Sequence, residues 1–235
     1  MVSRTLTALV CLVVAACSGL YNYEAPGYTV RPGDTLYTIA WRNGVDHRDL
    51  AAWNNLSDPD RLIVGQRLVL IPTGTRAVSS PAPAAPSSSA ASTSPQSAPQ
   101  PRREPMRTAY PAPAWQWPIR GAVLSRFGES GSLATGVSIA GQLGQPVAAA
   151  ADGEVVYAGG GLVAYGQVVI VKHNETYLSA YGYNRRLLVA EGDRVTRGQT
   201  IAEVGTGPDR RPRLHFEIRR NGDPIDPLAL LGAGS

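Results

Sequence analysis

Hydrophobic residues along the chain are grouped into segments that differ in length and in period. The first segment is the apolar run from Leu6 to Ala16, which follows the positively charged Arg4. A helix needs about 20 apolar residues to cross a bilayer, so this run is too short to span one. The pattern is typical of an export signal, here over residues 1–16.

Residues 27–73 contain short hydrophobic segments that change between the periods of strands and helices. Asp34 and Thr35 follow the first of these segments, and either residue is suited to cap a helix. The pattern predicts a strand over 28–30, a helix with Leu36, Ile39 and Ala40 on one face, a second helix over 48–53, and a closing strand within 62–72. We therefore expect a small α+β domain of the order strand, helix, helix, strand.

The polar segments on either side of this domain differ in length. Residues 74–114 consist mainly of Pro, Ala, Ser, Thr and Gln, which cannot bury enough apolar surface to offset the entropy of ordering. This segment is predicted to be a disordered linker. Residues 17–26 form a much shorter tether, so the small domain is expected to lie close to whatever holds residue 17.

Residues 115–235 predict a second domain of a different class. Short β-branched runs alternate with glycine-containing turns, and no helical period appears before a short helix expected at 227–231. The clearest predicted strands lie at 146–149, 153–157, 167–171 and 214–218. We therefore expect this domain to be mainly β.

The net charge of +4 does not indicate a nucleic-acid partner. The basic surplus lies mainly in the predicted linker, whereas basic and acidic residues are nearly balanced in both predicted domains. A phosphate-binding surface requires a concentrated basic patch. The distribution of charge therefore argues against nucleic-acid binding.

The export signal ends in Val14-Ala15-Ala16-Cys17, which resembles the lipobox of bacterial lipoproteins. The resemblance implies that Cys17 is acylated, and that Ser18 after it favours sorting to the outer membrane, with the chain on the periplasmic face. Several acyl chains on one cysteine anchor a protein stably. The alternative is an ordinary signal peptide in which Cys17 has no role. Since Cys11 lies in the removed segment, no disulfide is expected in the mature chain.

Residues 27–73 share several segments with one family of small domains. The segments are Tyr28-Thr29-Val30, Gly33-Asp34-Thr35-Leu36, Ile39-Ala40, Trp53-Asn54 and Val64-Gly65-Gln66-Arg67-Leu68. They resemble a LysM domain (βααβ), which implies binding of N-acetylglucosamine-containing glycan, here peptidoglycan, between two loops. The implied glycan-binding residues are Gly33, Asp34, Thr35, Leu36, Asp60, Arg61, Leu62 and Ile63. The alternative for Asp34 and Thr35 is that they only cap the helix.

Residues 115–235 also share segments with a known family. The segments are Trp117-Pro118, Arg126-Phe127-Gly128, Asp152-Gly153-Glu154-Val155-Val156-Tyr157-Ala158-Gly159, Val171-Lys172-His173, Leu178-Ser179-Ala180-Tyr181, Gly198-Gln199 and Leu214-His215-Phe216-Glu217-Ile218-Arg219. They resemble the LytM, or lysostaphin-like, zinc metallopeptidases, which implies the duplicated hybrid motif fold. In active members a His and an Asp four residues apart hold zinc together with a distant His.

The resemblance places the three zinc-ligand positions at Ala134, Ser138 and His215. Two further catalytic histidines of the family correspond to Tyr183 and Arg213. Alanine has no donor atom and a serine hydroxyl is a poor zinc ligand, whereas a catalytic zinc needs three protein ligands. His173 occupies a position that is not a ligand in the family, and His47 lies in the other domain. We therefore expect no metal, no cofactor and no peptidase activity.

The order of lipobox, LysM-like domain, Pro/Ala/Ser linker and degenerate LytM-like domain resembles the NlpD-type murein hydrolase activators of Gram-negative bacteria. The resemblance implies a non-enzymatic activator whose vacant groove binds a regulatory helix of a periplasmic N-acetylmuramoyl-L-alanine amidase. The amidase, a zinc enzyme, would then cleave septal peptidoglycan so that daughter cells separate. The implied groove residues are Ala134, Ser138, Tyr183, Arg213, His215 and Glu217. The alternative for any one of them is a role in packing alone.

Two other functions remain open at this point. One is a residual peptidoglycan zinc endopeptidase with an unrecognised ligand set, which stoichiometric zinc in the purified domain would support. The other is a passive tether between the outer membrane and the cell wall through the LysM-like domain alone. A passive tether would keep its function after deletion of residues 115–235.

Overall fold

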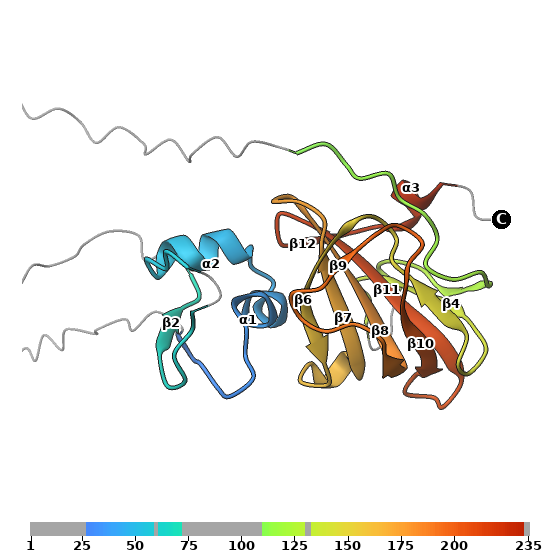
Figure 1. Ribbon diagram of the computed structural model, residues 1–235, viewed down its shortest axis with the longest axis horizontal. Helices are drawn as coiled ribbons and strands as arrows, with labels where there is room; N and C mark the ends of the chain where they lie inside the picture. Colours follow the sequence, from blue (N-terminus) through green and yellow to red (C-terminus); the bar gives the residue numbers. More distant parts are fainter. Residues whose placement is uncertain (1–26, 59–60, 72–109, 130–132, 233–235) are drawn as a thin grey trace, which may run out of the picture.

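The computed structural model describes residues 27–58, 61–71, 110–129 and 133–232, which form two domains packed against each other (Figure 1). The expected export signal, Cys17, Asp60 and most of the predicted linker lie outside the described residues. Within the described ranges, none of the helices has the length and apolar character needed to cross a membrane.

The N-terminal domain has the predicted order of strand, helix, helix, strand. Its elements are β1 (Gly27–Thr29), α1 (Leu36–Asn43), α2 (His47–Trp53) and β2 (Arg67–Val69), and the two strands pair antiparallel. Thr35 caps α1 in a reciprocal capping box with Thr38, and Gly44 ends the helix with φ 63°. The core is apolar, with Leu36, Ile39, Leu50 and Leu68 fully buried. The local pattern of caps and apolar positions therefore accounts for this domain.

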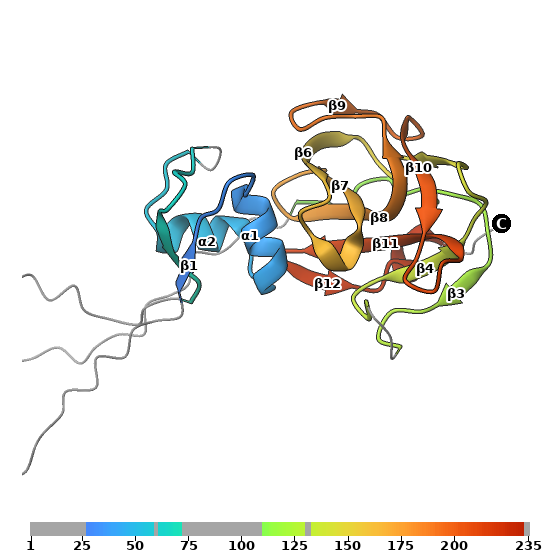
Figure 2. The same cartoon turned by 90° about the horizontal axis from the view of Figure 1, so that it is seen from below.

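The C-terminal domain is mainly β, as predicted. Its strands are β3 (Val123–Ser125), β4 (Val137–Ala140), β5 (Pro146–Ala148), β6 (Gly153–Gly159), β7 (Gln167–Lys172), β8 (Tyr177–Leu187), β9 (Arg194–Val195), β10 (Thr200–Thr206), β11 (Pro212–Arg220) and β12 (Asp223–Ile225). Two short helices, η1 (Val163–Tyr165) and α3 (Leu228–Leu231), complete it. The strands form one sheet, in which β11 pairs with β4, β8, β10 and β12 (Figure 2). Strand β11 is therefore central to the domain.

The packed part of the C-terminal domain begins before residue 115, where the sequence placed its start. The backbone amide of Tyr110 donates to Thr176 Oγ1 at 3.1 Å, and Asn174 Nδ2 donates to the carbonyl of Pro111 at 3.2 Å. Residues 110–114 are therefore not part of a free linker. Their composition resembles that of the linker, and only contacts with residues distant in sequence distinguish them.

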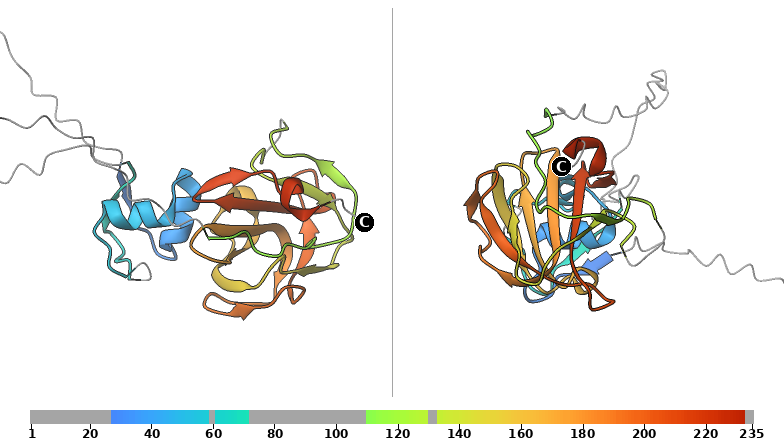
Figure 3. Two further views of the ribbon diagram at one scale, coloured as in Figure 1. Left: turned by 90° about the horizontal axis from the view of Figure 1, so that it is seen from above. Right: turned by 90° about the vertical axis from the view of Figure 1, so that its right-hand side faces the viewer.

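The two domains share an apolar cluster. Tyr37 and Trp41 of α1 pack with residues of the C-terminal domain, which include Val156, Tyr157, Leu162, Tyr165, Val168, Ile170, Leu178 and Ala180. Helix α1 faces the second domain and β2 lies on the far side, which is visible in Figure 1 and in the left view of Figure 3. The two domains are therefore in direct contact.

Candidate functional site

Strand β11 brings four of the six implied groove residues together with its neighbours β4 and β8. Ser138 on β4 lies directly opposite His215 on β11, and Arg213 lies two residues earlier on the same strand. Residues opposite one another, or two apart along a strand, share one face of the sheet. The ring of Tyr183, on β8, has its centroid 5.9 Å from that of His215. We call Ser138, Tyr183, Arg213 and His215 the groove residues.

Tyr183 has a backbone conformation that is uncommon for an aromatic residue. Its φ is 63°, in the left-handed region, and the register between β8 and β10 shifts next to it. Non-glycine residues in this region cost free energy and occur at sites where the surrounding structure holds them. The side chain is buried, with a relative exposure of 6%. The sheet therefore holds Tyr183 beside His215 at a cost in backbone strain.

Glu217 lies two residues after His215 on β11, on the same face of the sheet, and is fully buried in a hydrogen-bonded network. Its Oε1 accepts from Arg219 Nε at 2.7 Å, and its Oε2 accepts from Tyr165 Oη at 2.8 Å and from Thr135 Oγ1 at 2.9 Å. Burial alone would raise the pKa of Glu217, but His215 and Arg219 hold it below its ordinary value. Burial and the charge of Glu217 raise the pKa of Tyr165 to about 12. Glu217 is thus a fully buried carboxylate that connects Arg219, Tyr165 and Thr135.

Arg213 and Ala134 are less buried than the other implied groove residues. Arg213 pairs with Asp209, and its Nε is buried without a hydrogen-bond partner among the described residues. Ala134 is exposed in the turn that precedes β4. The guanidinium of Arg213 therefore has only part of its hydrogen-bonding capacity satisfied by the described residues.

The residues at the three positions that the resemblance implies for zinc ligands do not fit a zinc site. Ala134 has no donor atom, and Ser138 offers only a hydroxyl beside His215. Glu217 Oε2 lies 3.5 Å from His215 Nε2, but both carboxylate oxygens already accept hydrogen bonds from other residues. Among the described residues, no group of three or more His, Cys, Asp or Glu side chains could hold a metal ion. A three-ligand set is absent from this part of the chain.

Both ring nitrogens of His173 lie within hydrogen-bond distance of other residues of the domain. Its Nδ1 lies 2.7 Å from the carbonyl oxygen of Asp152 and its Nε2 lies 2.8 Å from Ser179 Oγ. The edge of its ring also contacts Trp115, with 4.8 Å between ring centroids. A carbonyl only accepts, so the neutral imidazole carries its proton on Nδ1. The contacts explain why this histidine is not available as a ligand.

Lowering the pH from 7 to 5 should lower the free energy of unfolding by about 2 kcal/mol for each of His47 and His173. Burial lowers the pKa of both to about 4, from an ordinary value of 6.5. The unfolded chain therefore takes up protons below 6.5 while the folded chain does not, so the stabilisation is complete above that pH and is lost as the pH falls. Chemical denaturation at both pH values measures the effect.

The variants His47→Gln and His173→Gln provide the controls for this pH dependence. Each should make the difference between pH 7 and pH 5 smaller by the contribution of the missing imidazole. An unchanged difference in both variants would show that other groups cause the pH dependence.

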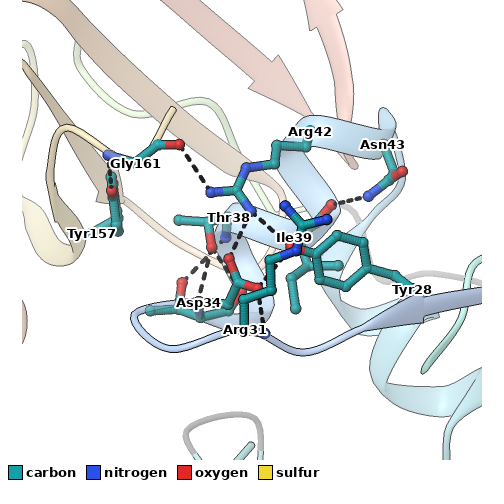
Figure 4. Close-up of polar contacts among 10 residues, drawn as sticks. Tyr28, Arg31, Asp34, Thr38, Ile39, Arg42, Asn43, Tyr157 and Gly161 are labelled. Atoms are coloured by element: carbon teal, nitrogen blue, oxygen red, sulfur yellow. Dashed lines mark hydrogen bonds and ion pairs between the residues drawn. The ribbon is translucent and has the colours of Figure 1, made fainter. Parts of the chain in front are cut away.

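The first of the two loops expected to bind glycan comprises residues 33–36. Within it, Asp34 does not cap helix α1. Its Oδ2 accepts from Tyr28 Oη at 2.7 Å and from the backbone amide of Arg31 at 2.8 Å, and its Oδ1 accepts from an Arg42 nitrogen at 2.6 Å (Figure 4). Thr35 alone provides the cap. Gly33 has φ 79°, with no atom within 4 Å of where a Cβ would lie. The side chain of Leu36 is fully buried, so only its backbone could face a ligand.

The second loop expected to bind glycan comprises residues 60–63, and its described part exposes an apolar side chain. Ile63 is 72% exposed, Arg61 is exposed and Leu62 is half-buried. Asp60 lies outside the described residues. Large exposed apolar side chains next to an exposed glycine turn are compatible with contact to a sugar face.

The sequence analysis did not identify the residues that form the contact between the two domains. Trp41 stacks on the guanidinium of Arg219, with 3.8 Å from Cζ to the ring centroid, and its carbonyl accepts from Arg219 at 2.9 Å. Tyr37 and Trp41 are four residues apart and form a second apolar stripe on α1. A small domain buries only one face of a helix in its own core, so a second apolar face on α1 indicates a contact with another domain.

Comparison with known proteins agrees with this architecture. Residues 28–70 match the LysM domain model and residues 132–227 match the model of Peptidase family M23. The chain is 44% identical to a lipoprotein NlpD/LppB homolog of Pseudomonas aeruginosa, over 96% of this chain and 90% of that protein. It is 38% identical to murein hydrolase activator NlpD of Escherichia coli, over 89% of this chain and 69% of that protein. The two predicted domain classes are thereby confirmed.

Proposed function

Since the chain belongs to the NlpD/LppB family of lipoproteins, we propose that it is a non-enzymatic activator of a peptidoglycan hydrolase. The observation that carries this function is the face formed by Ser138, Tyr183, Arg213 and His215, which keeps a peptidase-like sheet but lacks a set of three zinc ligands. A face of such a sheet without a bound metal is suited to binding a partner rather than to cleavage.

The LysM domain provides the contact with peptidoglycan. The glycan would bind between the first loop, with Gly33, Asp34, Thr35 and the backbone of Leu36, and the second loop, with Asp60, Arg61, Leu62 and Ile63. The fixed position of Asp34, with three hydrogen bonds, keeps the first loop preorganised. Acylation of Cys17 would anchor the chain at the periplasmic face of the outer membrane.

The groove residues provide the contact with the hydrolase, which we infer to be a periplasmic zinc amidase that acts on septal peptidoglycan. Buried aromatic and arginine side chains are frequent anchors of protein interfaces. Tyr183 and Arg213 provide one of each, and Arg213 Nε has no hydrogen-bond partner among the described residues. Binding of a regulatory helix of the amidase here would favour the open form of that enzyme and shift its population accordingly.

Dye release from labelled peptidoglycan sacculi tests the function. The unlipidated chain from residue 18 onward is assayed alone and together with each periplasmic amidase of the same organism. We expect release above that of the amidase only in one mixture, which would also identify the partner. Release by the chain alone would contradict a non-enzymatic role, and the absence of stimulation in every mixture would favour a passive tether.

The substitution Arg213→Glu should abolish stimulation in the same assay, because it reverses the charge of a groove residue. Arg211→Glu is the matched control, since both arginines lie near Asp209 but Arg211 is 82% exposed in its side chain. We expect Arg211→Glu to retain full stimulation. Equal stimulation by both variants would remove Arg213 from the partner-binding surface.

A further inference from the structure

A cavity of about 950 Å³ lies at the junction of the two domains. We call it the interdomain cavity. Tyr28 of β1, Arg31 and Asp34 line it from the N-terminal domain, and Ala134, Thr135 and Tyr165 line it from the C-terminal domain. Asp34 of the loop expected to hold glycan and the turn that contains Ala134 therefore border the same space.

Arg42 holds the two walls of this cavity in place. One of its terminal nitrogens donates to Asp34 Oδ1 at 2.6 Å and to Tyr28 Oη at 3.1 Å, and the other donates to the carbonyl of Gly161 at 3.1 Å. Figure 4 shows the side chain of Arg42 reaching from α1 toward Gly161, with Asp34 and Tyr28 on its other side. The cavity is therefore preformed by interactions within the chain, as ligand sites usually are.

The charge of the lining is positive. Arg31, Arg42 and Arg219 line the cavity, whereas Asp34 is the one acidic residue among the described lining residues. Asp34 pairs with Arg42 and the buried Glu217 pairs with Arg219. In the described ranges, the guanidinium of Arg31 has no carboxylate within 4.0 Å, and this residue is exposed. Its Cζ lies 5.8 Å from the centroid of the Tyr28 ring, which leaves the guanidinium without a charged partner among the described residues. Arg31 is thus the lining cation that is available to pair with an anionic ligand.

The remainder of the lining is apolar. Leu133, Leu162 and Val163 contribute side chains, and Val163 is 91% exposed. A cavity lined by aliphatic side chains and by a guanidinium without a carboxylate partner suits a ligand that combines a carboxylate with short aliphatic groups. The peptide stems of peptidoglycan have this chemistry, and they branch from the same strand whose sugars a LysM loop would hold.

We propose that the interdomain cavity binds the stem peptide of a peptidoglycan strand, with Arg31 pairing with a peptide carboxylate. The inference rests on the proposed binding of glycan by the LysM loop and adds a second part to that site. A strand bound across both parts places its peptide at the edge of the groove. The chain would then distinguish strands that still carry stem peptides from strands that an amidase has stripped.

Equilibrium binding to two purified probes tests this site. One probe is a set of glycan strands that retain stem peptides, and the other is the same strands after exhaustive removal of the peptides by an amidase. We expect the soluble chain to bind the peptide-bearing strands on the order of fivefold to tenfold more tightly at low salt, and less so at high salt, as for a charge-assisted contact near a surface.

The variant Arg31→Gln should lose this preference while binding stripped strands as the unaltered chain does. Arg194→Gln is the control, because Arg194 is an exposed arginine on β9 of the other domain and does not line the cavity. It should keep the preference. Equal affinity of the unaltered chain for both probes would overturn the inference while leaving glycan binding intact. Failure to bind either probe would overturn it together with the proposed binding of peptidoglycan.

Discussion

Replacing Glu217 by alanine should lower the free energy of unfolding by about 3–5 kcal/mol, the usual effect of breaking a buried ion pair on one side. The substitution leaves Arg219, which is buried, without its carboxylate, and removes the acceptor of Tyr165 and Thr135. Arg219 also contacts the ring and the carbonyl of Trp41, so the loss should extend to the contact between the domains. Urea denaturation monitored by tryptophan fluorescence measures the change in the free energy of unfolding.

Glu203→Ala is the matched control for this substitution. Glu203 also pairs with an arginine at 2.7 Å, but its partner Arg185 has a side chain that is 49% exposed. Exposed pairs contribute about 1 kcal/mol or less, because solvent screens the charges. Similar losses for the two variants would show that the buried network has no special contribution.

Restoring two side chains should create a zinc site in a chain that is not expected to have one. In the double variant Ala134→His with Ser138→Asp, the new carboxylate lies directly opposite His215 on the adjacent strand. The new histidine lies in the exposed turn four residues earlier, so that three ligands become available. We expect about one zinc per chain after dialysis, compared with a trace amount in the unaltered protein, as measured by atomic emission.

Two further variants control this experiment. Ala134→His alone should not retain zinc, because two imidazoles provide an incomplete set. Adding His215→Ala to the double variant should remove the metal again. If the unaltered chain itself retains stoichiometric zinc, the residues at 134, 138 and 215 are not the full ligand set and the non-enzymatic function fails.

The N-terminal domain was predictable because its elements depend on residues close together in sequence. Thr35 and Thr38 form the cap, Gly44 ends the helix, and the apolar positions of α1 and α2 repeat at helical spacing. The strands of the second domain were predictable for the same reason, since β-branched runs and glycine turns are local signals. The domain classes followed from motifs, which the comparisons confirm.

The roles of several side chains were not predictable, because they depend on distant partners. Asp34 is compatible with a helix cap in sequence, and it is Arg42 and Tyr28 that give it another role. Glu217 was expected in the groove, whereas the packing of β11 between its neighbours buries it completely. Local patterns contain no information on which positions along a central strand are covered by residues distant in sequence.

The sequence by itself determined the order of the elements, the two domain classes and the absence of donor atoms at Ala134. Each of these is a property of residue types and of their spacing. The tertiary structure decided how the domains meet, through contacts such as that of Arg219 with Trp41, which are 178 residues apart. It also decided that Asp34 of the N-terminal domain and Ala134 of the C-terminal domain line one cavity. Such contacts arise when apolar faces left unsatisfied within each domain become buried against each other, and no local signal specifies the partner.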